Sequence, residues 1–183
     1  MTTLYESLLG ASLAELPASL RHFHRDPQGG RARGTLRVLR GRNLLARLVG
    51  WGMGVPPESP GACVDLRVEV RDGVERWLRT FGGYPMVTRQ WAEGAHLVEA
   101  VGPTRMVFRL RVEAGTMRFE PLRVRLLGLT LPRWLSPTVT ASAGPPGEGD
   151  AATAWALCVE VVAPFVGRIV RYEGTMALEG PTP

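Results

Sequence analysis

The sequence predicts a mainly β fold: a curled antiparallel meander or barrel-like sheet of about eight to ten strands. Three observations lead to this expectation. Apolar and charged residues alternate in short runs from residue 62 onward, and glycine-containing turn signals separate these runs at close intervals. The first 25 residues instead carry an apolar stripe at helical spacing, so N-terminal helices should pack on the sheet or plug it. The whole chain, 1–183, is expected to form one domain.

Residues 1–25 form the predicted helical segment. Pro17 suits the first turn of a second helix, because proline has no amide hydrogen to leave unpaired there. The "DPQGG" at 26–30 then ends the segment. The apolar stripe needs a larger body to cover it. It comprises Leu4, Tyr5, Leu8, Leu9, Leu13, Leu16, Leu20 and Phe23.

Residues 34–54 combine a short strand, "GTLRVLRG", with a helix. Asn43 is suited to cap this helix, because its side chain can accept a hydrogen bond from a first-turn amide. An apolar helical face follows the cap. It is formed by Leu44, Leu45, Leu48 and Val49.

Residues 62–180 are predicted as the antiparallel meander. Val64, Leu66 and Val68 alternate with charged residues, and later runs keep the same period of two. A flexible loop is expected at 141–152, "ASAGPPGEGDAA", because little in it is large enough to bury. The alternative fold is an α+β helix-grip arrangement, which is disfavoured because the chain ends in strands and has no long C-terminal helix.

The composition argues against nucleic acid as a partner. All 22 basic residues are arginines and the formal net charge is +5, but the arginines are interleaved with 17 acids and form no dense stripe. Replacement of every lysine by arginine indicates a codon bias toward G and C. Two distant cysteines, no basic leader and no long apolar run favour a cytoplasmic protein without a transmembrane segment.

No catalytic signature occurs, so a non-catalytic protein is expected. Three histidines and two distant cysteines match no metal spacing, and neither a metal nor a cofactor is expected. His24 is expected at a helix C-terminus, where a partly charged imidazole would cap carbonyl groups. Glu160 stands in an apolar strand and is expected to pair with a strand arginine such as Arg171.

The stretch "VERWLRTFGGYPMVT", Val74 to Thr88, contains the candidate ligand-binding residues. If Gly82-Gly83 forms a two-residue turn, Phe81 lies opposite Tyr84 and Arg79 lies opposite Met86. Trp77, Arg79, Phe81, Tyr84, Met86 and Thr88 then share one face. A longer loop would instead bring Arg89 and Trp91 into the same role.

An arginine on an apolar face must be paired or must await a polar ligand. Arg79 therefore has three interpretations. It could be ion-paired, with Glu99 or Glu173 as the partner. It could lie on an outward face among stacked aromatics. It could line a cavity and hold the head group of a ligand through its planar fork of donors.

The chain resembles an uncharacterised bacterial family known only as a domain of unknown function. The resemblance rests on "LYESLLG" at 4–10, "LPASLRHFH" at 16–24, "GTLRVLRGRNLLARL" at 34–48, "ERWLRTFGG" at 75–83, "LLGLTLPRWLSP" at 126–137 and "PFVGRIVRYEG" at 164–174. Members occur alone or fused C-terminally to saccharopine-dehydrogenase-like domains. The resemblance implies His24, Trp77, Arg79, Phe81, Gly82, Pro132 and Tyr172 as matching positions, and it implies no catalytic assignment.

Three functions remain open from the sequence. The first is non-catalytic binding of a small apolar or amphipathic ligand, anionic amphiphiles included, within the curled sheet, with Arg79 and the aromatic residues around it. The second is an interaction or accessory domain for a dehydrogenase-like protein partner. The third is a cavity-type enzyme in which Glu160, Arg79 or His24 acts on a buried ligand.

Overall fold

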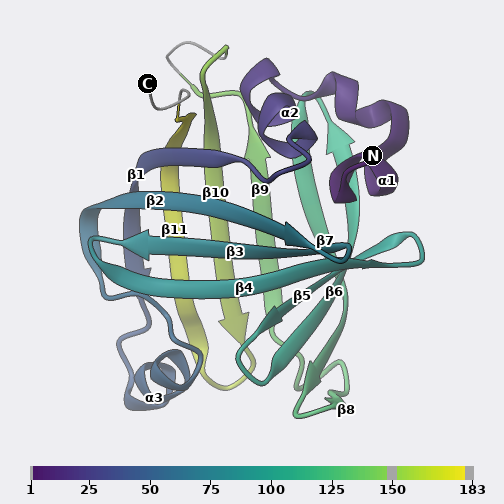
Figure 1. The fold of residues 1–183 in the computed structure, drawn as a ribbon. Helices are drawn as coiled ribbons and strands as arrows, with labels where there is room; N and C mark the ends of the chain where they lie inside the picture. The colour runs from purple at the N-terminus through teal and green to yellow at the C-terminus, as the bar shows by residue number, and fades with distance from the viewer. Residues whose placement is uncertain (1, 148–151, 180–183) are drawn as a thin grey trace.

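The computed structural model describes residues 2–147 and 152–179, and Figure 1 shows their fold. One antiparallel sheet contains all the strands and closes on itself, which confirms the predicted fold class. The strands are β1 (Arg31–Arg40), β2 (Ser59–Arg71), β3 (Val74–Phe81), β4 (Tyr84–Glu93), β5 (His96–Val101), β6 (Thr104–Glu113), β7 (Thr116–Leu126), β8 (Leu129–Thr130), β9 (Thr138–Gly144), β10 (Ala154–Ala163) and β11 (Gly167–Leu178).

The barrel has ten strands, because β8 pairs only with β7 and stands outside the ring. Strands from β1 to β7 follow one another around the ring, and β9, β10 and β11 complete it. Pairing of β1 with β11, with Val38 opposite Tyr172, joins the first strand to the last. Side chains that alternate along each strand therefore point either into the barrel or to its outside.

Short helices close one end of the barrel. They are α1 (Leu4–Leu9), the 3-10 helix η1 (Gly10–Glu15) and α2 (Ala18–Arg25). Thr3 and Glu6 form a capping box at the start of α1, and Ser19 donates from its hydroxyl to the carbonyl of Ala154 on β10. Most of the predicted stripe is buried against the sheet, with Tyr5 and Leu13 fully covered, and Leu4 and Leu8 are half-buried. We call this the capped end.

The opposite end, which we call the α3 end, carries α3 (Leu44–Gly52) and β8 (Figure 1). Asn43 caps α3 as predicted, accepting from the amide of Ala46. The same side chain donates from Nδ2 to the carbonyl of Val166 at 2.7 Å, which ties α3 to the turn between β10 and β11. The amide of Leu127 likewise donates to the carbonyl of Pro103.

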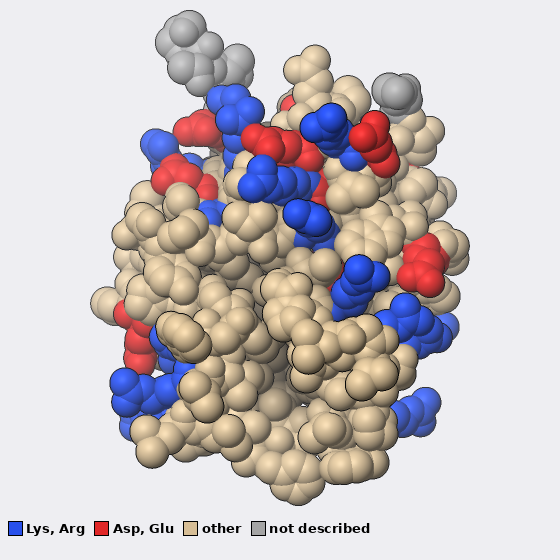
Figure 2. Space-filling model, turned by 60° about the horizontal axis from the view of Figure 1, so that its bottom comes forward, with Lys and Arg blue, Asp and Glu red and all other residues tan. Residues whose placement is uncertain are grey.

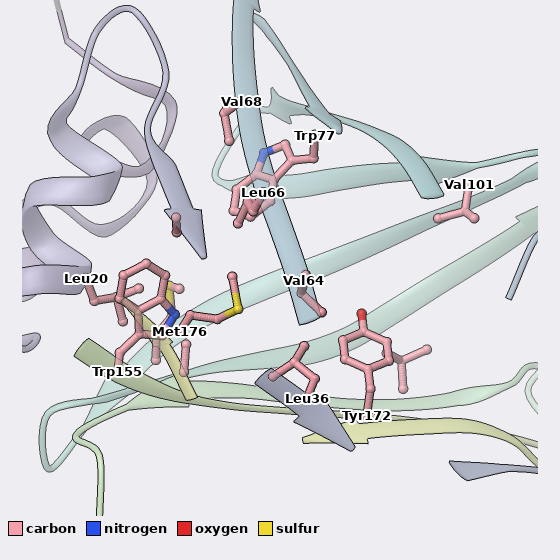
Figure 3. Close-up of a cluster of buried hydrophobic side chains, with 14 of the residues drawn as sticks. Leu20, Leu36, Val64, Leu66, Val68, Trp77, Val101, Trp155, Tyr172 and Met176 are labelled. Carbon is pink, nitrogen blue, oxygen red and sulfur yellow. The ribbon is translucent and has the colours of Figure 1, made fainter. Parts of the chain in front are cut away.

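The core is the barrel interior. Figure 3 shows side chains of β2 and β3, such as Leu66 and Trp77, facing Trp155 and Met176 of the opposite wall. The loop predicted at 141–152 is partly wrong: residues 141–144 belong to β9, where Ala143 packs into the core. Residues 148–151 lie outside the described residues.

Candidate ligand cavity

A cavity of about 120 Å³ lies inside the barrel. The N-terminal helices cover it at the capped end with Tyr5, Phe23 and His24, and the segment after α3 adds Met53 and Val55. Its volume approaches that of an engineered apolar cavity of about 150 Å³ that binds benzene. The barrel therefore leaves room for a small molecule or for one end of a longer one.

Methionine side chains are concentrated around this cavity. Every methionine of the chain except Met1 lines it: Met53, Met86, Met106, Met117 and Met176. Methionine is unbranched and polarizable, so it fills irregular space and repacks at low cost. The cavity can therefore change shape to fit an apolar guest more easily than one lined by branched residues.

One wall of the cavity region is polar. The strand registers place Glu75, Gln90 and Glu99 side by side across β3, β4 and β5. The Tyr5 hydroxyl donates to Gln90 Oε1 at 2.8 Å, and Trp77 Nε1 donates to Glu75 Oε2 at 2.9 Å. The facing wall, from β7, β9 and β10, contributes apolar side chains. The interior is therefore amphipathic across its width.

Arg79 lies on this polar wall and is only 12% exposed. Its Nη1 donates to Thr88 Oγ1 at 3.0 Å, and its guanidinium carbon stands 4.8 Å from the ring centroid of Trp77. The Arg79 Nη2 to Glu99 Oε1 distance is 3.9 Å, longer than the roughly 2.7–2.9 Å of a charged hydrogen bond. Arg79 is thus loosely ion-paired with Glu99, as one of its interpretations expected, and it also lines the cavity.

Burial changes the protonation of groups around the cavity. It raises the pKa of Glu75 to about 7, a shift that the Trp77 hydrogen bond opposes. It raises the pKa of Tyr172 to about 12, which keeps that phenol neutral. It lowers the pKa of His24 to about 3, so this imidazole is uncharged at neutral pH.

The expectation of a partly charged His24 capping carbonyl groups is therefore wrong. The residue does lie in the last turn of α2, but its ring is buried and stands 3.7 Å from the Tyr5 ring centroid. Its neighbours Phe23 and Trp77 are also aromatic. An imidazole enclosed by aromatic rings loses hydration, and this loss costs its charged form far more than its neutral form.

The two-residue turn at Gly82-Gly83 forms as predicted. Both glycines have positive φ, at 55° and 90°, which suits this tight hairpin turn. The register puts Phe81 opposite Tyr84 and Arg79 opposite Met86. Among the predicted site residues, Trp77 and Arg79 line the cavity.

The other predicted site residues lie elsewhere. Phe81 is buried beside Tyr172, with their ring centroids 5.6 Å apart, and Tyr84 is half-buried at the hairpin turn. Arg89 and Trp91 have the opposite alternation along β4 from Met86 and Thr88, so they lie on the outside of the barrel. Arg89 is exposed there, and Trp91 packs beneath the guanidinium of Arg105. The structure does not bring these two residues to Arg79.

Sequence reasoning missed Tyr5, Gln90 and Glu75 as parts of the interior. A signal for two of them existed: once the Gly82-Gly83 turn fixes the register, Gln90 continues the inward set of Met86 and Thr88, and Glu75 continues that of Trp77 and Arg79. Tyr5 had no such signal, because its position over β4 depends on how the N-terminal helices dock.

Glu160 is not in the cavity. Its Oε1 accepts from Arg168 Nε at 2.6 Å, and its Oε2 lies 3.7 Å from Arg171 Nη1, so the predicted pairing with Arg171 forms. Among residues 2–147 and 152–179, no group of three or more His, Cys, Asp or Glu side chains is arranged to hold a metal ion. No helix in the described part of the chain is long and apolar enough to cross a membrane.

The model of a family described as a domain of unknown function, DUF4166, matches residues 16–176. No curated protein matches the chain.

Proposed function

We propose that this chain, which belongs to the DUF4166 family of domains of unknown function, binds a small apolar or amphipathic molecule inside the β-barrel. It does so without catalysing a reaction. The observation that carries the proposal is the amphipathic, methionine-rich cavity that contains Arg79. Binding sites for small molecules are mostly apolar with a few placed polar groups, and this interior has that composition.

The polar wall indicates the kind of head group. Arg79 donates to Thr88, but its Nη2 lies 3.9 Å from Glu99 Oε1. Both Arg79 and Glu99 line the cavity, so one ligand atom can bridge the arginine donor and the carboxylate acceptor. A hydroxyl or a protonated acid can accept from the first and donate to the second. A permanent anion would be repelled by Glu99. A neutral amphiphile therefore fits better than the anionic ligand that Arg79 alone favours.

Arg79→Met tests this role. The substitution keeps an unbranched side chain but removes every donor. Displacement of an uncharged, apolar fluorescent probe by 1-octanol should therefore weaken roughly tenfold, the worth of a charged hydrogen bond. Arg89→Met is the matched control, because Arg89 lies outside the barrel on the neighbouring strand. In the Arg89→Met variant, octanol should displace the probe as it does in the parent.

Removing Arg79 also leaves Glu99 without its partner, which could lower stability for structural reasons alone. The double variant Arg79→Met/Glu99→Gln removes that charge and should fold at least as well as Arg79→Met while still binding octanol weakly. If both variants bind probe and octanol like the parent and only the melting temperature falls, Arg79 has a structural role and the proposed ligand contact is wrong.

The accessory-domain alternative needs no cavity occupant. An accessory domain for a dehydrogenase-like partner would leave the cavity closed to apolar probes, whereas the proposed function requires them to enter. The cavity-enzyme alternative requires turnover of the bound molecule, which recovery of unchanged octanol after incubation would exclude for that probe. The proposed setting is the cytoplasm, where the free thiols of Cys63 and Cys158 stay reduced.

A further inference from the structure

The α3 end of the barrel exposes large apolar side chains. On α3 these are Leu44, Leu48 and Trp51, the last with 77% of its surface exposed. Strand β8 and the turns around the same end add Leu127, Leu129, Trp134 and Phe165. Within residues 2–147 and 152–179, the exposed large apolar side chains away from this end are Val70, Val87 and Leu122. A concentration of this kind at one end of a molecule indicates an interaction surface.

Two of these residues are held in a backbone conformation that does not suit them. Leu127 has φ 52° and is 79% exposed, and Phe165 has φ 63° and is 85% exposed. Bulky residues rarely adopt this left-handed region. Another turn of the barrel, between β2 and β3, has Asp72 and Gly73 at its positive-φ positions, and aspartate tolerates such a backbone better than leucine or phenylalanine does. Neither packing nor turn geometry therefore explains Leu127 and Phe165.

The same end is basic. The segments 40–58, 101–105, 125–137 and 164–168 contain one acid, Glu58, and seven arginines, of which Arg168 is paired with Glu160. Arg42, Arg47 and Arg133 are exposed and form no ion pair with a described residue. Figure 2, in which the lower part of the molecule comes forward, shows an uncharged surface around a hollow, with basic side chains and fewer acidic ones toward its edges.

We propose that the α3 end docks on the surface of an anionic lipid bilayer. Leucine, phenylalanine and tryptophan side chains would enter the boundary between head groups and acyl chains, where tryptophan is favoured. The unpaired arginines would meet lipid phosphates. This docking does not depend on the cavity being occupied, although it would turn this end of the barrel toward the lipid.

A soft, anionic surface fits this end better than a second copy of the chain does. In a symmetric dimer the patch would face itself, and Arg42, Arg47 and Arg133 would approach their own equivalents with Glu58 as the one acid of these segments to offset them. The uncharged surface at this end is hollowed (Figure 2), so it presents no flat face for a rigid partner. Lipid chains can adapt to such an outline.

The test is flotation of the full chain with two kinds of vesicle. One kind is phosphatidylcholine alone, and the other contains about 30% phosphatidylglycerol, which gives the vesicle a negative surface charge. We expect binding to the anionic vesicles, weaker binding to neutral ones, and loss of the difference at high salt. Tryptophan emission should shift to shorter wavelength on binding, because Trp51 and Trp134 are exposed in the free protein.

The double variant Leu127→Asn/Phe165→Asn separates docking from folding. Asparagine tolerates the left-handed backbone, so the melting temperature should stay the same or rise. Vesicle binding should fall roughly tenfold or more, because two apolar side chains no longer enter the lipid. Ala114→Asn is the matched control: Ala114 has φ 49° in an exposed turn at the capped end, and its substitution should leave vesicle binding unchanged.

Several results would overturn the proposal. One is failure of the parent protein to bind either vesicle. Another is equal vesicle binding by the parent and the double variant. A third is a concentration-dependent dimer, measured by light scattering, that the double variant abolishes while no vesicle binding occurs, since a second copy would then cover this end. Octanol displacement of the cavity probe is measured without lipid, so failure of docking and failure of the proposed ligand binding are distinguishable.

Discussion

Deletion of residues 1–25 is expected to leave an insoluble or molten protein. The segment buries Tyr5, Leu13, Leu20 and Phe23 against the barrel, and each fully buried side chain of this size contributes about 1.5–3 kcal/mol. Their sum is comparable with the whole stability of a typical domain, about 5–15 kcal/mol. The measurement is near-UV circular dichroism of the truncated chain, which should lose its aromatic signal.

A graded variant keeps this test informative if the truncated chain cannot be purified. Leu20 is buried under the capped end, so Leu20→Ala should lower the free energy of unfolding by about 2–5 kcal/mol. A truncated protein that melts at the parent's temperature, or a Leu20→Ala variant as stable as the parent, would show that the helices are a removable arm.

Acid is expected to destabilise the protein through His24. The pKa of this imidazole is about 3 in the fold and about 6.5 in an unfolded chain. Below pH 6.5 the unfolded chain takes up a proton that the folded chain does not. The stability that neutral His24 contributes is therefore fully present above pH 6.5 and is lost as pH falls toward 3. Two pH units below 6.5 the loss is about 2–3 kcal/mol.

His24→Gln isolates this effect, because glutamine does not titrate. The free energy of unfolding in urea is measured for both proteins at pH 7 and pH 4.5. The parent should lose about 2–3 kcal/mol relative to the variant between these pH values. Glu75 acts in the opposite direction, since its raised pKa favours the fold at lower pH, but it is present in both proteins and cancels in the comparison. The same pH dependence in both proteins would mean that His24 is hydrated.

The architecture could be predicted from the sequence because its signals are local. Alternation along runs such as Val64, Leu66 and Val68 marks strands that are buried on one side, and the glycine-containing turns separate them. The Gly82-Gly83 turn also indicated the register of its hairpin, so Arg79 was predicted on one face with Trp77 and Phe81, while whether that face points inward stayed open. An antiparallel meander allows this, since neighbours in sequence are neighbours in the sheet.

The parts that the sequence could not provide are set by long-range contacts. Closure of the ring joins β1 to β11 across most of the chain, and no local pattern specifies that pairing. The position of Tyr5 against Gln90 and the burial of His24 depend on how the N-terminal helices dock. The apolar face of α3 was visible in the sequence, but its exposure was not, because periodicity identifies an apolar stripe without saying what covers it.

Methyl NMR of the protein labelled with ¹³C-methyl methionine tests the central claim most directly, because Met53, Met86, Met106, Met117 and Met176 all line the cavity. Titration with benzene or 1-octanol should shift these methyl signals in a saturable way while the indole signal of exposed Trp134 stays in place. That result would show a guest inside the barrel. Methyl signals that stay unshifted up to the solubility limit of both probes, or shifts confined to Trp134 and its surroundings, would contradict the proposal that the barrel holds a ligand.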